Sequence, residues 1–201
     1  MWSQQAYIKA SNTGPGDFFG TAVALSADSN TLAVGARSEG SSATGINGDQ
    51  EDNQAQGSGA VYVFTRSDET WSQQAYLKAS NASAYDNFGT TVALSTDGST
   101  LAVGATTEDS ANTDPNDDSA SGAGATYLFV RDSSNNWFQQ AYLKASNADD
   151  DDNFGFAVTL SSDSDLLAVS AWQESSSAQD IDGDQVSNHK PGAGAVYLRK
   201  C

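Results

Sequence analysis

The sequence is dominated by one unit that occurs three times. The segment from Trp2 to Asn12 returns almost unchanged at Trp71 to Asn81 and at Trp137 to Asn147, at spacings of 69 and 66 residues. A Phe-Gly pair follows each copy at the same two intervals, at positions 19–20, 88–89 and 154–155. A structural unit repeated at a fixed period indicates a repeat architecture. We therefore divide the chain into three repeats of one domain or half-domain, approximately residues 2–70, 71–136 and 137–201.

Each repeat contains four short segments with the composition of β-strands. In the first full unit they are the run after Phe-Gly, then Leu32 to Ala36, then Gly59 to Phe64, and finally the segment that begins at Trp71. These segments are rich in Val, Leu, Tyr and Phe and are bounded by Ser, Asp, Asn and Gly, which is typical of strands separated by turns. The chain is therefore predicted to be all-β.

The third strand is apolar on both faces, because Val61 and Val63 point one way while Tyr62 and Phe64 point the other. A sheet that is apolar on both faces needs neighbours on both sides. Radial stacking of four-stranded antiparallel sheets, as in a β-propeller, supplies that cover. The alternatives are a β-solenoid, whose coil is usually much shorter than these repeats, and a β-sandwich, which gives no reason for threefold near-identity.

Charge restricts the partners that the chain can bind. The sequence has 26 acidic and 9 basic residues, a net charge of -17, which disfavours DNA, RNA and anionic membrane surfaces. It has no apolar run long enough to span a membrane. The single cysteine, Cys201, allows no disulfide within the chain.

The order Phe-Gly, Val-Ala-Leu and Leu-Ala-Val-Gly-Ala resembles the FG-GAP repeat of integrin α-subunit propellers. The resemblance covers nearly the whole chain and departs from the pattern at Ser170, which replaces the glycine of Gly-Ala in the third repeat. It implies that the Phe-Gly run forms the innermost strand of each blade and the Trp segment the outermost. It also implies a non-enzymatic binding, cell-adhesion or scaffolding module that is secreted or displayed on the cell surface.

The order of the strands predicts an incomplete ring. The chain starts with an outermost strand, Trp2 to Ala10, and ends with a third strand, Gly194 to Leu198, so the last blade lacks an outer strand. Closed propellers typically have about 4 to 8 blades, and three sheets leave apolar faces open. We expect a homodimer that forms a six-bladed ring by exchanging the first strand. The competing interpretation is a piece of a longer propeller.

Long polar loops between the second and third strands carry oxygen-bearing side chains at matching positions. Glu39, Glu108 and Glu174 occupy one such position, and alternating acids and amides follow them. The candidate calcium ligands are Asn47, Asp49 and Glu51 in the first loop, Asp114, Asn116 and Asp118 in the second, and Asp180, Asp182 and Asp184 in the third. Alternate oxygen donors on a turning backbone suit Ca²⁺. The alternative is that these acidic loops are merely solvated.

The calcium ligands of the integrin family cannot be transferred to this chain. The resemblance places them in the turn between the first and second strands, which is short here, for example at residues 26–30. A further acid precedes each Phe-Gly pair, at Asp17, Asp86 and Asp152, and we expect it to cap the turn into the innermost strand.

A few residues are candidates for other functions, namely ligand binding or catalysis. Trp172, at the start of a variable loop, is the best candidate for a specific ligand contact, and with it a carbohydrate-binding lectin is one alternative. Trp2, Trp71 and Trp137 are expected to pack between blades. His189 is the only histidine, which leaves no Ser-His-Asp arrangement in prospect. A glycosidase-like pair of carboxylates is the remaining enzymatic alternative.

Overall fold

The computed structural model describes residues 1–200, which form three antiparallel β-sheets. Cys201 lies outside the described residues. The strands are β1 (Phe19–Leu25), β2 (Thr31–Ala36), β3 (Ala60–Ser67), β4 (Thr70–Leu77), β5 (Phe88–Leu94), β6 (Thr100–Ala105), β7 (Ala125–Arg131), β8 (Trp137–Leu143), β9 (Phe154–Leu160), β10 (Leu166–Ala171) and β11 (Ala195–Lys200). The all-β prediction is confirmed.

Each sheet follows the order of the chain. The first sheet has the order β1-β2-β3-β4 and the second β5-β6-β7-β8, while the third contains only β9, β10 and β11. Two sheets thus have the predicted four strands, and the third has three, as expected for a last blade that lacks its outer strand. In the two complete sheets the fourth strand, β4 or β8, comes from the Trp segment of the following repeat, and within the described residues β11 has no such strand beside it.

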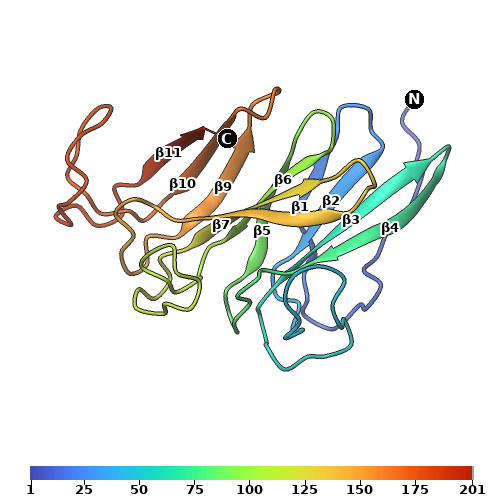
Figure 1. Cartoon of the computed structure of the whole chain (residues 1–201), viewed down its shortest axis with the longest axis horizontal. Helices are drawn as coiled ribbons and strands as arrows, with labels where there is room; N and C mark the ends of the chain where they lie inside the picture. Colours follow the sequence, from blue (N-terminus) through green and yellow to red (C-terminus); the bar gives the residue numbers. More distant parts are fainter. Residues whose placement is uncertain (201) are drawn as a thin grey trace.

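The three sheets lie side by side, as Figure 1 shows. Strand β5 contacts β1 and β2 of the first sheet, and β9 contacts β5 and β6 of the second. Val61 and Val63 are buried in a cluster with residues of the second sheet such as Phe129, while Tyr62 and Phe64 are buried in a separate cluster on the opposite side. The first sheet thus buries apolar side chains on both of its faces, and one face packs on the next sheet. This is the arrangement of consecutive propeller blades.

Neighbouring sheets approach most closely where the second strand meets the next Phe-Gly turn. A Cβ placed on Gly35 would lie 2.0 Å from the carbonyl oxygen of Gly89, and one on Gly104 would lie 2.0 Å from that of Gly155. Only glycine fits at such a contact. The equivalent residue in the third sheet is Ser170, whose Oγ accepts a hydrogen bond from the Ala157 amide at 3.0 Å.

The outer surfaces of the first and third sheets are open. Val23 and Leu25 are 65% and 52% exposed on β1, and Val196 and Leu198 are 68% and 64% exposed on β11. Residues 2–10 form no strand in the described structure, although Ala10 is buried against the first sheet. The sheet that lacks an outer strand is present as predicted. The strand expected at residues 2–10 is not formed, because this segment pairs with no sheet edge in the described structure.

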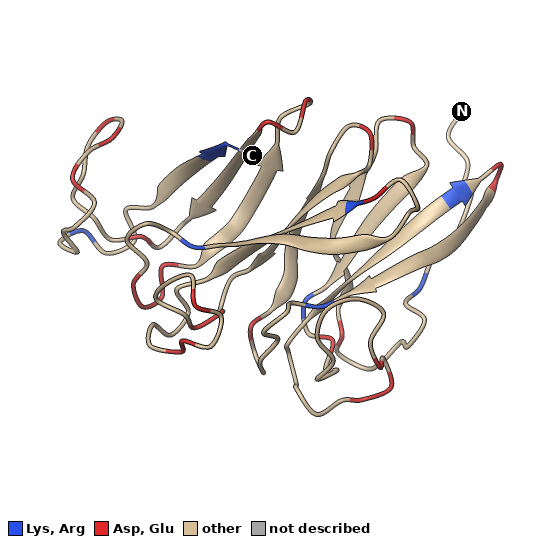
Figure 2. Cartoon of the chain, viewed as in Figure 1, with Lys and Arg blue, Asp and Glu red and all other residues tan. Residues whose placement is uncertain are grey.

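Acidic residues lie mainly in the loops and turns at the two ends of the sheets, as Figure 2 shows, whereas the strands carry few charged residues. The strands therefore form an apolar frame with charged, solvated ends. Across residues 1–200 we find no helix with the length and hydropathy of a membrane span.

Candidate functional site

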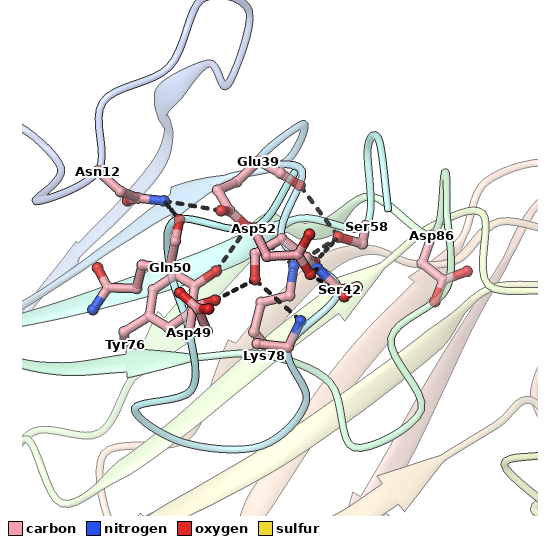
Figure 3. A network of polar contacts seen from close by, with 12 residues as sticks. Asn12, Glu39, Ser42, Asp49, Gln50, Asp52, Ser58, Tyr76, Lys78 and Asp86 are labelled. Atoms are coloured by element: carbon pink, nitrogen blue, oxygen red, sulfur yellow. Dashed lines mark hydrogen bonds and ion pairs between the residues drawn. The ribbon is translucent and has the colours of Figure 1, made fainter. Parts of the chain in front are cut away.

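A buried carboxylate organises the loop end of the first sheet (Figure 3). Glu39, only 1% exposed, follows β2 and accepts hydrogen bonds from the Tyr76 hydroxyl at 2.8 Å and from Lys78 Nζ at 3.0 Å. Both donors come from the Trp segment that supplies β4. Asn12, from the preceding copy of that segment, donates to the other carboxylate oxygen at 3.0 Å. One glutamate thus joins two successive Trp segments to the long loop.

The second sheet repeats this arrangement. Glu108 accepts from Asn81 Nδ2 at 3.0 Å, from the Tyr142 hydroxyl at 2.6 Å and from Lys144 Nζ at 2.8 Å. Burial lowers the pKa of Lys144, and the facing Glu108 carboxylate partly offsets that effect. Burial likewise lowers the pKa of Lys78, and the Glu39 carboxylate partly offsets that effect. Such pairs are costly to break, because removing one partner leaves an isolated buried charge.

The third sheet has the glutamate without the lysine and tyrosine. Glu174 is 2% exposed and accepts from Asn147 Nδ2 at 2.8 Å and from the backbone and hydroxyl of Ser176 at 3.0 and 3.1 Å. It lies in the lining of a depression of about 690 Å³ beside β11. Within residues 1–200, no lysine forms an ion pair with it.

These glutamate and lysine pairs were not predicted from the sequence. The sequence pattern places the glutamates in the long loops and the lysines in the Trp segments, without connecting the two. The available signal was the spacing, because Lys9, Lys78 and Lys144 recur at the same intervals as Glu39, Glu108 and Glu174.

The acid before each Phe-Gly pair caps a turn, as expected. Carboxylate oxygens of Asp17, Asp86 and Asp152 accept from backbone amides three residues earlier, at 2.6, 2.8 and 2.9 Å. Burial raises the pKa of Asp86 to about 7 and that of Asp152 to about 6. The buried carboxyl groups thus stabilise the turn that leads into the inner strand.

The predicted calcium ligands lie in the long loops, where several of them stabilise local turns. Asp49, Asp114 and Asp184 each accept a hydrogen bond from the backbone amide two residues later. Asn47 instead binds β4, because its side-chain oxygen accepts from the Tyr76 amide at 3.0 Å. No group of three or more His, Cys, Asp or Glu within residues 1–200 is positioned to hold a metal ion.

The remaining members of the series, Glu51, Asn116, Asp118, Asp180 and Asp182, also lie in these loops. Asp180 and Asp182 line the depression beside Glu174. They therefore place negative charge at the open edge of the third sheet.

The aromatic candidates divide by exposure. Trp172 is 50% exposed and its ring lies 5.4 Å from that of Phe156, which is 49% exposed. Trp137 is 5% exposed in the cluster between the first and second sheets, so the packing role expected for it is confirmed. Trp2 is fully exposed.

A polar depression of about 1120 Å³ lies on the loop end of the first sheet. It is lined by residues 11–18, by parts of the long loop after β2 and by the turn between β4 and β5. Two aromatic side chains, Phe18 and Tyr85, belong to its lining and are 59% and 61% exposed. Arg37 lies 5.4 Å above the Phe18 ring, and the Tyr85 hydroxyl donates to Gln56 at 3.1 Å.

Both aromatic residues occupy left-handed backbone positions. Phe18 has φ 54°, where the other repeats have Asn87 and Asn153, and Tyr85 has φ 71°, where they have Gly16 and Asp151. Glycine, asparagine and aspartate tolerate this conformation, whereas a bulky side chain there is strained. Strain of this kind concentrates at functional sites. The sequence signal for these positions is the comparison of repeats, because an aromatic residue stands where the other repeats have Gly, Asn or Asp.

Comparison with known families gives one match. The model of the FG-GAP repeat matches residues 2–64, 71–129 and 137–198. A comparison with curated proteins finds none that matches. FG-GAP repeats are generally non-catalytic modules and are typical of extracellular and cell-surface proteins.

Proposed function

The chain belongs to the FG-GAP repeat family, and on that premise we propose that it is a non-catalytic adhesion module, secreted or displayed on the cell surface, that binds a protein partner. The depression beside Phe18 and Tyr85 is the proposed binding site. The observation that carries this proposal is the pair of exposed aromatic side chains held at strained backbone positions on its rim.

Several properties of this surface suit protein recognition. Large aromatic side chains provide most of the binding energy at many protein interfaces, and polar surroundings set the orientation of the partner. The frame beneath the loops is rigid, because the buried Glu39 joins the long loop to both adjacent Trp segments. Loops carried on a rigid scaffold are common binding sites.

The proposal predicts that the double variant Phe18→Asn, Tyr85→Gly loses partner binding and gains stability. Each substitution installs the residue type of another repeat at that position, so removing the strain is expected to raise the unfolding free energy by about 1 kcal/mol per site. Binding is measured by immobilising the chain and testing a panel of purified extracellular-matrix and cell-surface proteins. The thermal unfolding midpoint of both proteins gives the stability change.

The matched control is Phe138→Ser, which also replaces an exposed aromatic with the residue of the other repeats but lies on the outer strand β8. It should retain binding. The proposal fails if no protein in the panel binds above background, or if the double variant binds as well as the unmodified chain.

A lectin is the second candidate, and the exposed contact between Phe156 and Trp172 favours it. Sugar rings stack on such aromatic surfaces. A glycan array separates the two functions: a glycan signal that is lost in Trp172→Ala and retained in the Phe18 and Tyr85 variant would favour the lectin.

Calcium stabilisation remains a prediction from the acidic series, and the third loop with Asp180, Asp182 and Asp184 offers its densest set of carboxylates. At ten times the dissociation constant, calcium that binds only the folded chain raises its stability by about 1.4 kcal/mol. Thermal unfolding in calcium chloride measures this. Magnesium chloride at equal ionic strength is the control, because any divalent salt screens a net charge of -17. Equal midpoints in the two salts would contradict specific binding.

A further inference from the structure

The first Trp segment carries a tyrosine and a lysine whose side chains form no hydrogen bond or ion pair within residues 1–200. In the next two copies these positions are Tyr76 with Lys78 and Tyr142 with Lys144, and each pair binds a buried glutamate. Their counterparts, Tyr7 and Lys9, are exposed, Tyr7 by 81%. The segment therefore presents two glutamate-binding side chains to solvent.

The third sheet has a glutamate that lacks this pair. Glu174 is 2% exposed and faces the depression of about 690 Å³ beside β11. Among the described residues, its carboxylate accepts hydrogen bonds only from Asn147 and Ser176. In the first two sheets the corresponding carboxylates are bound by a Tyr in the outer strand and by the Lys directly after that strand. A buried carboxylate is costly without a nearby cation, so the site at Glu174 is incomplete.

The missing strand has a defined register. In the first sheet Val61 pairs with Leu77, Tyr62 with Tyr76 and Val63 with Ala75. In the part of the chain that the structure describes, β11 pairs only with β10 and its other edge is free. The equivalent pairing sets Val196 opposite Ile8, Tyr197 opposite Tyr7 and Leu198 opposite Ala6.

We propose that residues 2–10 of a second copy of the chain add to β11 as its fourth strand, and that Tyr7 and Lys9 of the second copy complete the Glu174 site. The segment cannot do so within its own chain. Ala10 is buried against the first sheet and Asn12 is bound to Glu39, while the second sheet separates the first from the third. Reciprocal exchange between two copies gives two such junctions and a ring of six sheets.

The open faces support the same pairing. Val196 and Leu198 are the counterparts of Val61 and Val63, which are buried between the first and second sheets. Val23 and Leu25 are the counterparts of Val92 and Leu94, which lie on the other side of that contact. The exposed apolar face of the third sheet in one copy can therefore pack against the exposed apolar face of the first sheet in the other copy. Asp180 and Asp182 in the depression add negative charge around the incoming Lys9.

Static light scattering with size-exclusion chromatography tests the proposal on the 201-residue chain. At micromolar concentration we expect twice the chain mass of 20.9 kDa. Lys9→Glu should raise the dimer dissociation constant by about 100-fold or more, because it places a second carboxylate beside a buried one. Lys9 is exposed in the single chain, so the variant should fold normally. Lys190→Glu changes the charge equally at another exposed lysine and should leave the constant within about twofold.

A mixing experiment tests the specific contact. Lys9→Glu and Glu174→Lys should each dimerise alone at least about 100-fold more weakly than the unmodified chain, since each places like charges at both junctions. Mixed together, they should form a heterodimer with one native junction and one exchanged junction. A wild-type mass of 20.9 kDa at all concentrations, a mass of three or more chains, or an unchanged dissociation constant for Lys9→Glu would overturn the proposal.

Ser170 provides a second test. At the two internal junctions glycine occupies its position against the next Phe-Gly turn, so its side chain must displace that turn when the ring closes. Ser170→Gly is therefore expected to tighten the dimer by about tenfold, the effect of relieving roughly 1.4 kcal/mol of steric strain. An unchanged dissociation constant would contradict close packing between the third sheet and the first sheet of the second copy.

Discussion

Replacing Lys78 with methionine is expected to lower the free energy of unfolding by about 3 to 5 kcal/mol. Lys78 is fully buried, and its Nζ lies 3.0 Å from Glu39 Oε2 and 2.6 Å from Ser58 Oγ. Methionine retains much of the side-chain volume but leaves Glu39 as an uncompensated buried carboxylate. Urea unfolding followed by tryptophan fluorescence measures the loss.

Two comparisons separate the charge from the packing at this site. The double variant Lys78→Met, Glu39→Gln removes both charges and should recover a large part of the lost stability. Lys190→Met removes an exposed lysine and should change stability by less than about 0.5 kcal/mol. If Lys78→Met were as stable as the unmodified chain, the buried pair would not hold the outer strand to the loop.

The substitution Gly35→Ala should destabilise the contact between the first and second sheets by about 3 kcal/mol. The added methyl group would meet the Gly89 carbonyl at 2.0 Å, and neither backbone segment can move without disturbing its own sheet. Gly35 is not at a positive φ, so the cost reports the close approach rather than backbone strain. Thermal and urea unfolding give the change in stability.

Ser170→Ala is the matched control, because Ser170 occupies the same place in the sheet that has no neighbour in the chain. It loses one hydrogen bond, from the Ala157 amide, and should cost about 1 kcal/mol or less. Equal effects of the two substitutions would mean that the sheets are not packed at the Phe-Gly turns as described.

The sequence was sufficient to predict the repeats, the strands and their order. Alternation of apolar residues is a local property, so Leu32 to Ala36 and Gly59 to Phe64 could be placed to within a few residues of β2 (Thr31–Ala36) and β3 (Ala60–Ser67). The turn role of Asp86 was predicted for the same reason, because its partner lies three residues away.

The buried site was not predicted, because its contacts join distant segments. Glu39 and Lys78 meet only after the long loop folds back on β4, and strand periodicity contains no information about that path. The strain at Phe18 and Tyr85 was also missed, since it depends on backbone angles. The one sequence signal for that strain is that the other repeats carry Asn, Gly or Asp at the positions of Phe18 and Tyr85.

Residue-resolved hydrogen exchange tests most directly whether the first Trp segment is a strand that another copy receives. Below the dimer dissociation constant, the amides of residues 3–9 should exchange rapidly, while those of 72–77 in β4 are protected. Above it, residues 3–9 and the free edge of β11 should become protected together. Protection of residues 3–9 that does not depend on protein concentration would contradict the account.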